Sequence, residues 1–196
     1  MSHPQDKRPG RGDAEPAPAA SRTGRQARVL IRAPELADQA EFLAQMRASE
    51  HLHRPWIFPP TTAAAFDEYL RRMATDDHCG FLVCERETGR IAGVININNI
   101  VRSAFLSATL GYYAVAGLGG RGYMREGLAL VTDHAFRALH LHRVEANIQP
   151  ANERSKALVR ASGFRLEGLS PEYLFIDGAW RDHERWTLID DRKGLY

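Results

Sequence analysis

The first half of the chain alternates between short β-rich runs and amphipathic segments. The run RVLIRAP, residues 28–34, predicts a strand that leads into a helix, whereas HLHRPWIFPP, residues 51–60, predicts a loop. Thr61 or Thr62 predicts the start of a second helix, because a threonine side chain can accept a hydrogen bond from a free N–H of the first turn. Apolar side chains at helical spacing continue that helix to about Met73.

Three strands follow at short intervals. Residues 81–100 predict a hairpin that turns at residues 87–89, and SATLGYYAV, residues 107–115, predicts a third strand. Because the connections are short, we expect these strands to form an antiparallel meander.

The second half of the chain changes from a glycine-rich segment to helices and strands in alternation. A long amphipathic helix is predicted from its apolar positions, which are Met124, Leu128, Val131, Ala135 and Leu139. Residues 142–148 predict a strand, and the next helix begins at Asn152 and is closed by Gly163. Asp177-Gly178 predicts a tight hairpin turn between the last strands. The order of elements predicts an α+β (mixed α/β) domain.

Composition adds a tail to this picture. Residues 1–27 are rich in Pro, Ala, Gly and Arg, so we expect them to be disordered, with one folded domain over residues 28–196. Up to Arg28 the chain carries six basic and three acidic residues, although its whole net charge is only +2. The basic tail is therefore a candidate for a weak contact with RNA or the ribosome. Its charge is only weak evidence that the folded domain binds nucleic acid.

Cysteine and histidine positions favour neither a disulfide scaffold nor a metal site. The two cysteines, Cys79 and Cys84, lack metal-ligand spacing, and the eight histidines form no H-x-x-x-H pair. We therefore expect no metal and a reduced, cytoplasmic setting. The sequence also has no apolar run typical of a membrane span or a signal peptide, so we expect no membrane association.

The segment GLGGRG, residues 117–122, matches the dinucleotide fingerprint G-x-G-x-x-G. A dinucleotide fold places this turn after its first strand and continues with further βαβ units, whereas here three strands precede it and a hairpin ends the chain. Glu145, the candidate ribose ligand, lies within a strand. We therefore favour a different phosphate site, in which glycines let a pyrophosphate approach the N–H groups of a helix start.

The chain resembles the GNAT N-acetyltransferases in GGRGYMREGL and in HRVEANIQPANERSKALVRASGF, which begin at Gly119 and His142. NIVRSAFLSATLGY and YLFIDGAWRDHERWTL are similar to the RimJ/RimL-type ribosomal-protein N-terminal acetyltransferases, above all the RimJ branch. The resemblance covers the chain from Arg28 onwards. It implies the GNAT fold, a splayed mixed sheet flanked by helices, with acetyl-CoA as cosubstrate.

The resemblance also implies where acetyl-CoA binds. The pantetheine arm is expected to pair with the open fourth strand, and the pyrophosphate to take N–H groups from the glycine loop. The implied contacts are Tyr113, Ala114, Val115, Gly117, Gly119, Gly120, Arg121, Gly122 and Tyr123. Gly117 stands where the broad superfamily has Gln or Arg, so Arg121 and Arg125 are candidates for the positive charge.

The resemblance implies that the thioester end of acetyl-CoA lies at the start of the next helix. Asn152 and Ser155 share one face of its first turn; Asn152 is implied to contact the pantetheine and Ser155 to face the sulfur as the acid. A simple helix cap and an exposed serine are the alternatives from composition. The base is open, because Thr109 stands where related enzymes have Glu; Glu50 is a candidate.

We therefore expect an acetyl-CoA-dependent N-acetyltransferase that acts on the N-terminal α-amine of a ribosomal or other protein, as a monomer or dimer. One alternative changes the acceptor to a small amine or amino acid. The other is a non-catalytic acyl-CoA-binding or ribosome-assembly factor. Aromatic candidates for the walls of the acceptor cleft are Trp56, Phe58, Tyr112, Tyr173 and Trp180.

Overall fold

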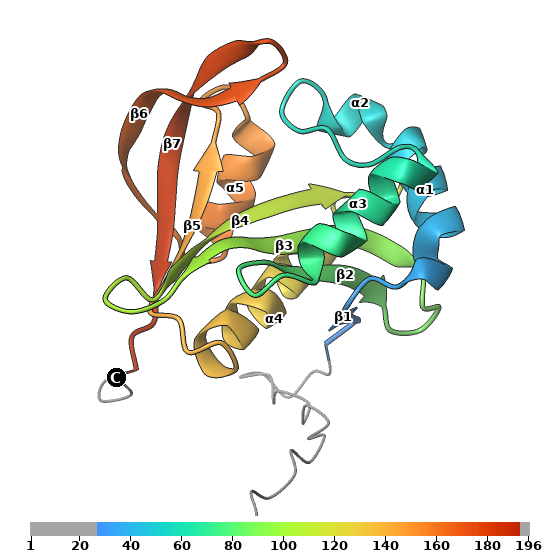
Figure 1. The fold of residues 1–196 in the computed structure, drawn as a ribbon, viewed down its shortest axis with the longest axis horizontal. Helices are drawn as coiled ribbons and strands as arrows, with labels where there is room; N and C mark the ends of the chain where they lie inside the picture. The colour runs from blue at the N-terminus through green and yellow to red at the C-terminus, as the bar shows by residue number, and fades with distance from the viewer. Residues whose placement is uncertain (1–26, 193–196) are drawn as a thin grey trace, which may run out of the picture.

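The computed structural model describes residues 27–192; residues 1–26, which contain almost all of the predicted tail, lie outside this range. Its elements, in chain order, are β1 (Val29–Arg32), the 3-10 helix η1 (Leu36–Asp38), α1 (Gln39–Ala48), α2 (Glu50–His53), α3 (Ala63–Met73), β2 (Cys79–Glu85), β3 (Ile91–Val101), β4 (Ser107–Ala114), α4 (Tyr123–Arg137), β5 (Arg143–Ile148), α5 (Glu153–Ala161), β6 (Arg165–Ile176) and β7 (Ala179–Ile189) (Figure 1).

All seven strands form one mixed sheet in the order β1-β2-β3-β4-β5-β7-β6. Neighbouring strands are antiparallel except β4 and β5, which run parallel and pair only from Ser107↔Arg143 to Leu110↔Ala146. Beyond that point β4 stays paired with β3 as far as Ala114, and β5 stays paired with β7 as far as Ile148. The two halves of the sheet therefore separate between β4 and β5. The predicted α+β class and mixed sheet are confirmed.

Helices α1 and α3 lie on one face of the sheet and α4 on the other (Figure 1), and each face has its own hydrophobic core. Side chains that alternate along β3 and β4 divide between them: Ile95 and Tyr112 pack on the side of α4 and α5, whereas Val94 and Tyr113 pack on the side of α1 and α3. The period of two along a strand explains this division. Both faces of β4 are therefore covered where it reaches the opening of the sheet.

Local signals set the starts of α3 and α5 as predicted. The Thr62 hydroxyl accepts a hydrogen bond from the N–H of Ala65 at 3.3 Å, and Asn152 caps α5 in the same way. Gly122 precedes α4 in a left-handed conformation with φ 82°, and Gly163 follows α5 with φ 88°. These positions favour glycine because a Cβ disfavours positive φ.

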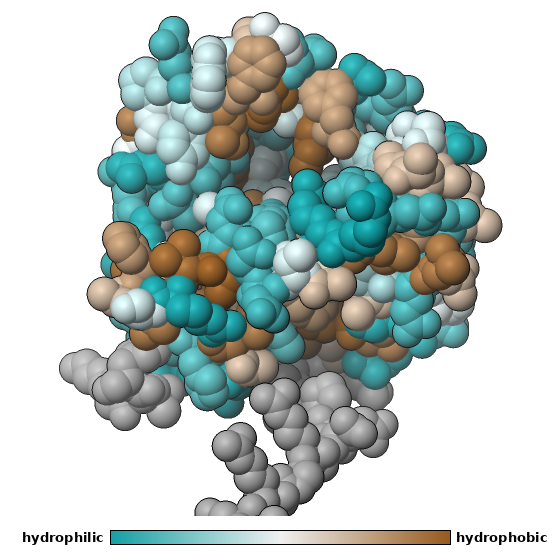
Figure 2. Space-filling model, viewed as in Figure 1, coloured by the Kyte–Doolittle hydropathy of each residue, from teal (hydrophilic) through white to brown (hydrophobic). Residues whose placement is uncertain are grey.

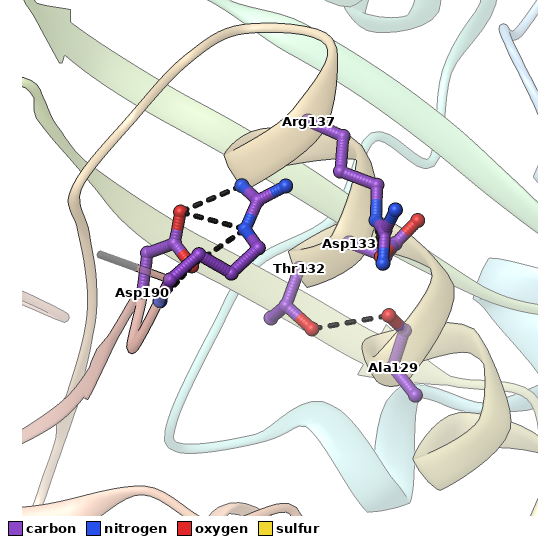
Figure 3. A network of polar contacts seen from close by, with 6 residues as sticks. Ala129, Thr132, Asp133, Arg137 and Asp190 are labelled. Atoms are coloured by element: carbon purple, nitrogen blue, oxygen red, sulfur yellow. Dashed lines mark hydrogen bonds and ion pairs between the residues drawn. The ribbon is translucent and has the colours of Figure 1, made fainter. Parts of the chain in front are cut away.

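Figure 3 shows polar contacts within α4 and at Asp190, just after β7. On α4, Thr132 donates to the carbonyl of Ala129 at 3.1 Å, and Arg137 pairs with Asp133 at 2.5 Å. Asp190, just after β7, is buried; its N–H donates to the carbonyl of His142, in the turn between α4 and β5, at 2.9 Å. This last hydrogen bond joins the end of β7 to the turn that follows α4.

Two differences from the sequence prediction concern element boundaries. The segment predicted as a loop begins with the one-turn helix α2, which is too short to show helical periodicity. Helix α4 ends at Arg137, short of the predicted Leu139. Between residues 27 and 192 no helix has both the length and the apolar character needed to span a bilayer.

Candidate active site

The opening between β4 and β5 contains a cavity of about 920 Å³. Its walls come from α2, the second half of β4, the glycine loop with the start of α4, the end of β5, and α5. In Figure 2 the surface is hollowed on this side of the molecule, with apolar residues on both sides of the hollow. Several segments that are distant in sequence therefore meet around one space of the size that small-molecule sites have.

At this opening, backbone N–H and C=O groups of β4 that point away from β3 are not paired with β5. Val115 donates its N–H to Ala92 of β3 at 3.0 Å, so the alternation of an antiparallel ladder turns the backbone groups of Tyr113 toward β3 as well. The same alternation turns the N–H and C=O groups of Tyr112 and Ala114 toward the gap. Of the three predicted pantetheine contacts, Ala114 faces the gap through its backbone, Tyr113 lines the cavity, and Val115 is fully buried.

His53 of α2 already uses one of these groups. Its Nε2 lies 2.8 Å from the carbonyl oxygen of Ala114 and so carries the hydrogen of this bond. The His53 ring is 3% exposed and packs edge-on against Tyr113, and burial lowers its pKa. In the resulting neutral tautomer Nδ1 is an acceptor. The loop prediction over residues 51–60 did not identify His53 as part of the site.

The glycine loop meets the requirements of an anion site. Gly117, Gly120 and Gly122 have positive φ, and a Cβ added at Gly120 would meet no atom within 4 Å. The predicted residues that line the cavity here are Gly119, Gly120, Gly122 and Tyr123. The structure places Gly117 and Arg121 outside that lining, although Arg125 belongs to it.

Arg28 adjusts the charge at the start of α4. The first helical turn contains Glu126, whose negative charge opposes anion binding, and Arg28 donates to this carboxylate through Nε at 2.8 Å and through its backbone N–H at 2.9 Å. Another Arg28 nitrogen donates to the carbonyl of Arg121 at 2.7 Å. The ion pair offsets the carboxylate and fixes the loop, so the positive end of the helix dipole faces the cavity.

The start of α5 brings the predicted reactive residues into the same space. Asn152 and Ser155 both line the cavity, and the Asn152 Oδ1 atom accepts the Ser155 N–H at 3.1 Å. The side-chain oxygen of Asn152 therefore acts as the helix cap, as the alternative from composition predicted. Ser155 Oγ lies 2.5 Å from the hydroxyl of Tyr112, which also lines the cavity. Burial raises the pKa of Tyr112 to about 12, so it is protonated at neutral pH.

The structure does not bring Glu50 to this site. Glu50 begins α2 with its side chain about 60% exposed, and its carboxylate accepts a hydrogen bond from Arg54 at 2.8 Å. The single turn of α2 presents Leu52 and His53 to the cavity instead. Thr109, at the position of the missing acid, donates its hydroxyl to the carbonyl of Asn98 at 3.2 Å. Neither residue is placed to remove a proton from an acceptor in the cavity.

Several buried polar atoms around the cavity have no hydrogen-bond partner among the described residues. They are His53 Nδ1, Asn147 Oδ1 and Gln149 Nε2. Unpaired buried polar atoms are rare in folded proteins because each costs desolvation free energy, and their concentration at one cavity indicates a polar ligand. Asn147 and Gln149 were not among the predicted site residues, although two amide side chains two residues apart near the carboxyl end of β5 point to the same face.

The charge of the cavity is positive. Of the described residues that line it, Arg125 and Arg154 carry a permanent charge, and none is Asp or Glu. Elsewhere in residues 27–192 no group of three or more His, Cys, Asp or Glu side chains is placed to hold a metal ion. Glu145, the rejected ribose candidate, lies within β5 and pairs with Arg143 at 2.9 Å. The wall aromatics Trp56 and Tyr112 line the cavity, whereas Phe58, Tyr173 and Trp180 do not.

Comparisons with known proteins agree with this geometry. The structure is similar to that of Mycobacterium smegmatis RimJ in complex with CoA-disulfide, with a TM-score of 0.75, 31% identity, and coverage of 82% of this chain and 81% of that one. It is also similar to the ribosomal-protein-S5-alanine acetyltransferase of Vibrio fischeri, with a TM-score of 0.73, 28% identity, and coverage of 85% and 96%.

In sequence, the chain is 43% identical over 93 residues to the [ribosomal protein uS5]-alanine N-acetyltransferase of Escherichia coli. This match spans about half of each protein, 47% of this chain and 48% of that one. The family model described as an acetyltransferase (GNAT) domain matches residues 28–165. The chain therefore belongs to the GNAT acetyltransferase family.

Proposed function

We propose that this acetyltransferase transfers the acetyl group of acetyl-CoA to the N-terminal α-amine of a protein, with ribosomal proteins as the first candidates. The observation that carries the proposal is the single cavity that joins a glycine loop and helix start at one part of its lining to the Ser155–Tyr112 hydroxyl pair at another. The names of the RimJ and uS5-alanine relatives support the choice of acceptor.

The residues present fit acetyl-CoA. The N–H groups from Gly119 to Tyr123 are available for the pyrophosphate. The gap-facing backbone of Tyr112 and the N–H of Ala114 are available for the amide groups of the pantetheine arm. Arg125 and Arg154 add positive charge for the phosphates. Unpaired Asn147 Oδ1 and Gln149 Nε2 provide an acceptor and a donor near the end of β5.

The chemistry places modest demands on these residues. The amine attacks the thioester carbonyl carbon, the C–N bond forms, the C–S bond breaks, and the proton lost by the amine balances the one gained by sulfur. Ser155 needs only to donate a hydrogen bond to the leaving sulfur, because a thiol pKa of about 8.5 makes the thiolate a good leaving group. Backbone N–H groups of β4 that face the gap are placed to stabilise the oxyanion.

The charge of the cavity favours an α-amine over a polyamine. A polyamine brings several positive charges and would need carboxylates, but none of the described residues that line the cavity is Asp or Glu. A protein N-terminus has a pKa of about 7.7–8.0, so roughly a tenth to a fifth is already neutral at pH 7. A free lysine, with a pKa of about 10.4, is neutral in less than about one thousandth of molecules.

The test measures CoA thiol release with three acceptors. We expect a peptide that begins with Ala or Ser and lacks lysine to react at least about tenfold faster than the same peptide with a blocked N-terminus and one free lysine. Spermidine should not react above background. Turnover of spermidine but no peptide would select the small-amine alternative, whereas CoA binding with no turnover of any acceptor would select a non-catalytic binding factor.

A further inference from the structure

Two hydroxyl groups meet in the cavity at hydrogen-bond distance. Tyr112 comes from the gap-facing half of β4 and Ser155 from the first turn of α5, and their oxygens are 2.5 Å apart. Each group has one hydrogen, and a single bond uses only one of the two. The direction of this bond decides whether the Ser155 hydrogen is available to a ligand.

The chemistry of the pair favours one direction. A phenol is a stronger acid than an aliphatic alcohol, so the more favourable bond has Tyr112 as donor and Ser155 Oγ as acceptor. Tyr112 also keeps its hydrogen at neutral pH, because burial raises its pKa to about 12. Ser155 is held from the other side, since Asn152 Oδ1 accepts its N–H at 3.1 Å. Asn152 thus holds the backbone of Ser155, and Tyr112 holds its Oγ.

We propose that Tyr112 is a positioning residue that donates its hydroxyl hydrogen to Ser155 Oγ and thereby directs the Ser155 hydrogen into the cavity, toward the sulfur that leaves during acetyl transfer. This inference rests on the proposed function. Tyr112 keeps its own proton throughout, and the proton that ends on sulfur replaces the one lost by the amine. Without the tyrosine hydroxyl, the Ser155 rotor is free to adopt orientations that do not meet the sulfur.

The kinetic test uses the full chain with acetyl-CoA and a peptide acceptor. We expect Tyr112→Phe to lower kcat about tenfold while KM for acetyl-CoA changes by less than about twofold, because the lost bond acts only when sulfur gains charge. Because Tyr112 acts through Ser155, the double variant with Ser155→Ala should be no slower than Ser155→Ala alone. A Tyr112→Phe enzyme as fast as wild type, or rate losses that multiply in the double variant, would overturn the proposal.

A matched control removes a different buried tyrosine hydrogen bond. The Tyr69 hydroxyl donates to Asn96 at 2.9 Å in the core on the other face of the sheet, so Tyr69→Phe makes the same chemical change away from the cavity. We expect Tyr69→Phe to lower the melting temperature and leave kcat unchanged. An equal fall of kcat in both variants would assign the effect to folding and contradict the proposal.

A binding measurement gives a readout that needs no acceptor. Because Ser155 donates to the sulfur, the thiol pKa of bound CoA, followed by the ultraviolet absorbance of the thiolate, should be lower in wild type than in Tyr112→Phe or Ser155→Ala. Equal thiol pKa values in all three proteins would overturn the role of Tyr112. If wild type acetylates no acceptor but shows this difference, the proposed function fails and the hydrogen-bond inference stands.

Discussion

Gly120 and Gly89 hold nearly the same left-handed backbone conformation, with φ angles of 75° and 73°. An added Cβ would meet no atom within 4 Å at either position, so alanine would introduce backbone strain without a clash. Gly120 lines the cavity, whereas Gly89 lies in the turn between β2 and β3. A comparison of alanine substitutions at the two positions therefore distinguishes the effect of backbone strain from the effect on ligand binding.

We expect Gly120→Ala and Gly89→Ala to lower the free energy of unfolding, measured by urea denaturation, by similar amounts of about 1–2 kcal/mol. Only Gly120→Ala should also weaken CoA binding in calorimetry, by about tenfold, because relief of the strain moves N–H groups away from the pyrophosphate. Equal CoA affinity in the two variants would contradict a role of the loop in binding phosphate.

Individual site residues were predictable where a motif fixed their backbone. The glycine loop and the pair Asn152 and Ser155 reached the cavity because both lie at helix starts, which short sequence signals specify. His53 was missed because nothing in its own segment shows that Ala114, sixty-one residues later, offers it a carbonyl. Glu50 was a wrong candidate for the same reason: nothing in its own segment shows that its side chain pairs with Arg54 and not with a group in the cavity.

At the scale of elements, helix α4 packs closely on the sheet at Gly127. A Cβ at this position would lie 2.6 Å from a methyl group of Val83 on β2, so the helix approaches the strand more closely than alanine allows. Because α4 carries the N-terminal turn at the cavity, this contact also sets the position of the phosphate site.

Gly127→Ala should lower the free energy of unfolding by about 1–3 kcal/mol through overpacking, although alanine favours helices by about 1 kcal/mol. In a Val83→Ala background the same substitution should be neutral or stabilising, because the clashing methyl groups are absent. Urea denaturation of the four proteins measures this coupling. An equal loss in both backgrounds would show that the close approach does not cause the effect.

Most elements were predictable because local rules decide them. The hairpin turn at Asp177-Gly178 formed with φ values of 51° and 75°, as its residue types require, and Thr62 and Asn152 cap their helices. The separation of β4 from β5 could not be derived from periodicity, because it depends on where the pairing of two strands stops. The expectation of a splayed sheet came from the family resemblance.

At the scale of the whole molecule, the domain contains three histidines whose pKa burial lowers. They are His53, His134 and His183. The unfolded chain therefore binds more protons than the folded chain below the ordinary histidine pKa of about 6.5. Stability is fully present above that pH and is lost as the pH falls toward the lowered values.

We expect the melting temperature to fall as the pH is lowered from about 7 to about 5. This whole range lies above the ordinary pKa values of Asp and Glu, about 3.9 and about 4.3, so histidines dominate the change. His134 packs edge-on against Phe81 outside the cavity, so His134→Gln should flatten this slope without affecting CoA binding. The exposed His140→Asn serves as the control and should leave the slope unchanged. An identical slope in both variants would contradict the assignment to buried histidines.

The early end of the β4–β5 ladder gives the sheet an internal edge. Edge strands present unpaired N–H and C=O groups that invite another strand, and proteins usually protect them. Here the gap-facing groups of Tyr112 and Ala114 lie in a cavity that residues of α2 and α5 also line, so both helices cover this edge. The fold thus shields an edge that would otherwise pair with another strand, and leaves its free amide groups to a ligand in the cavity.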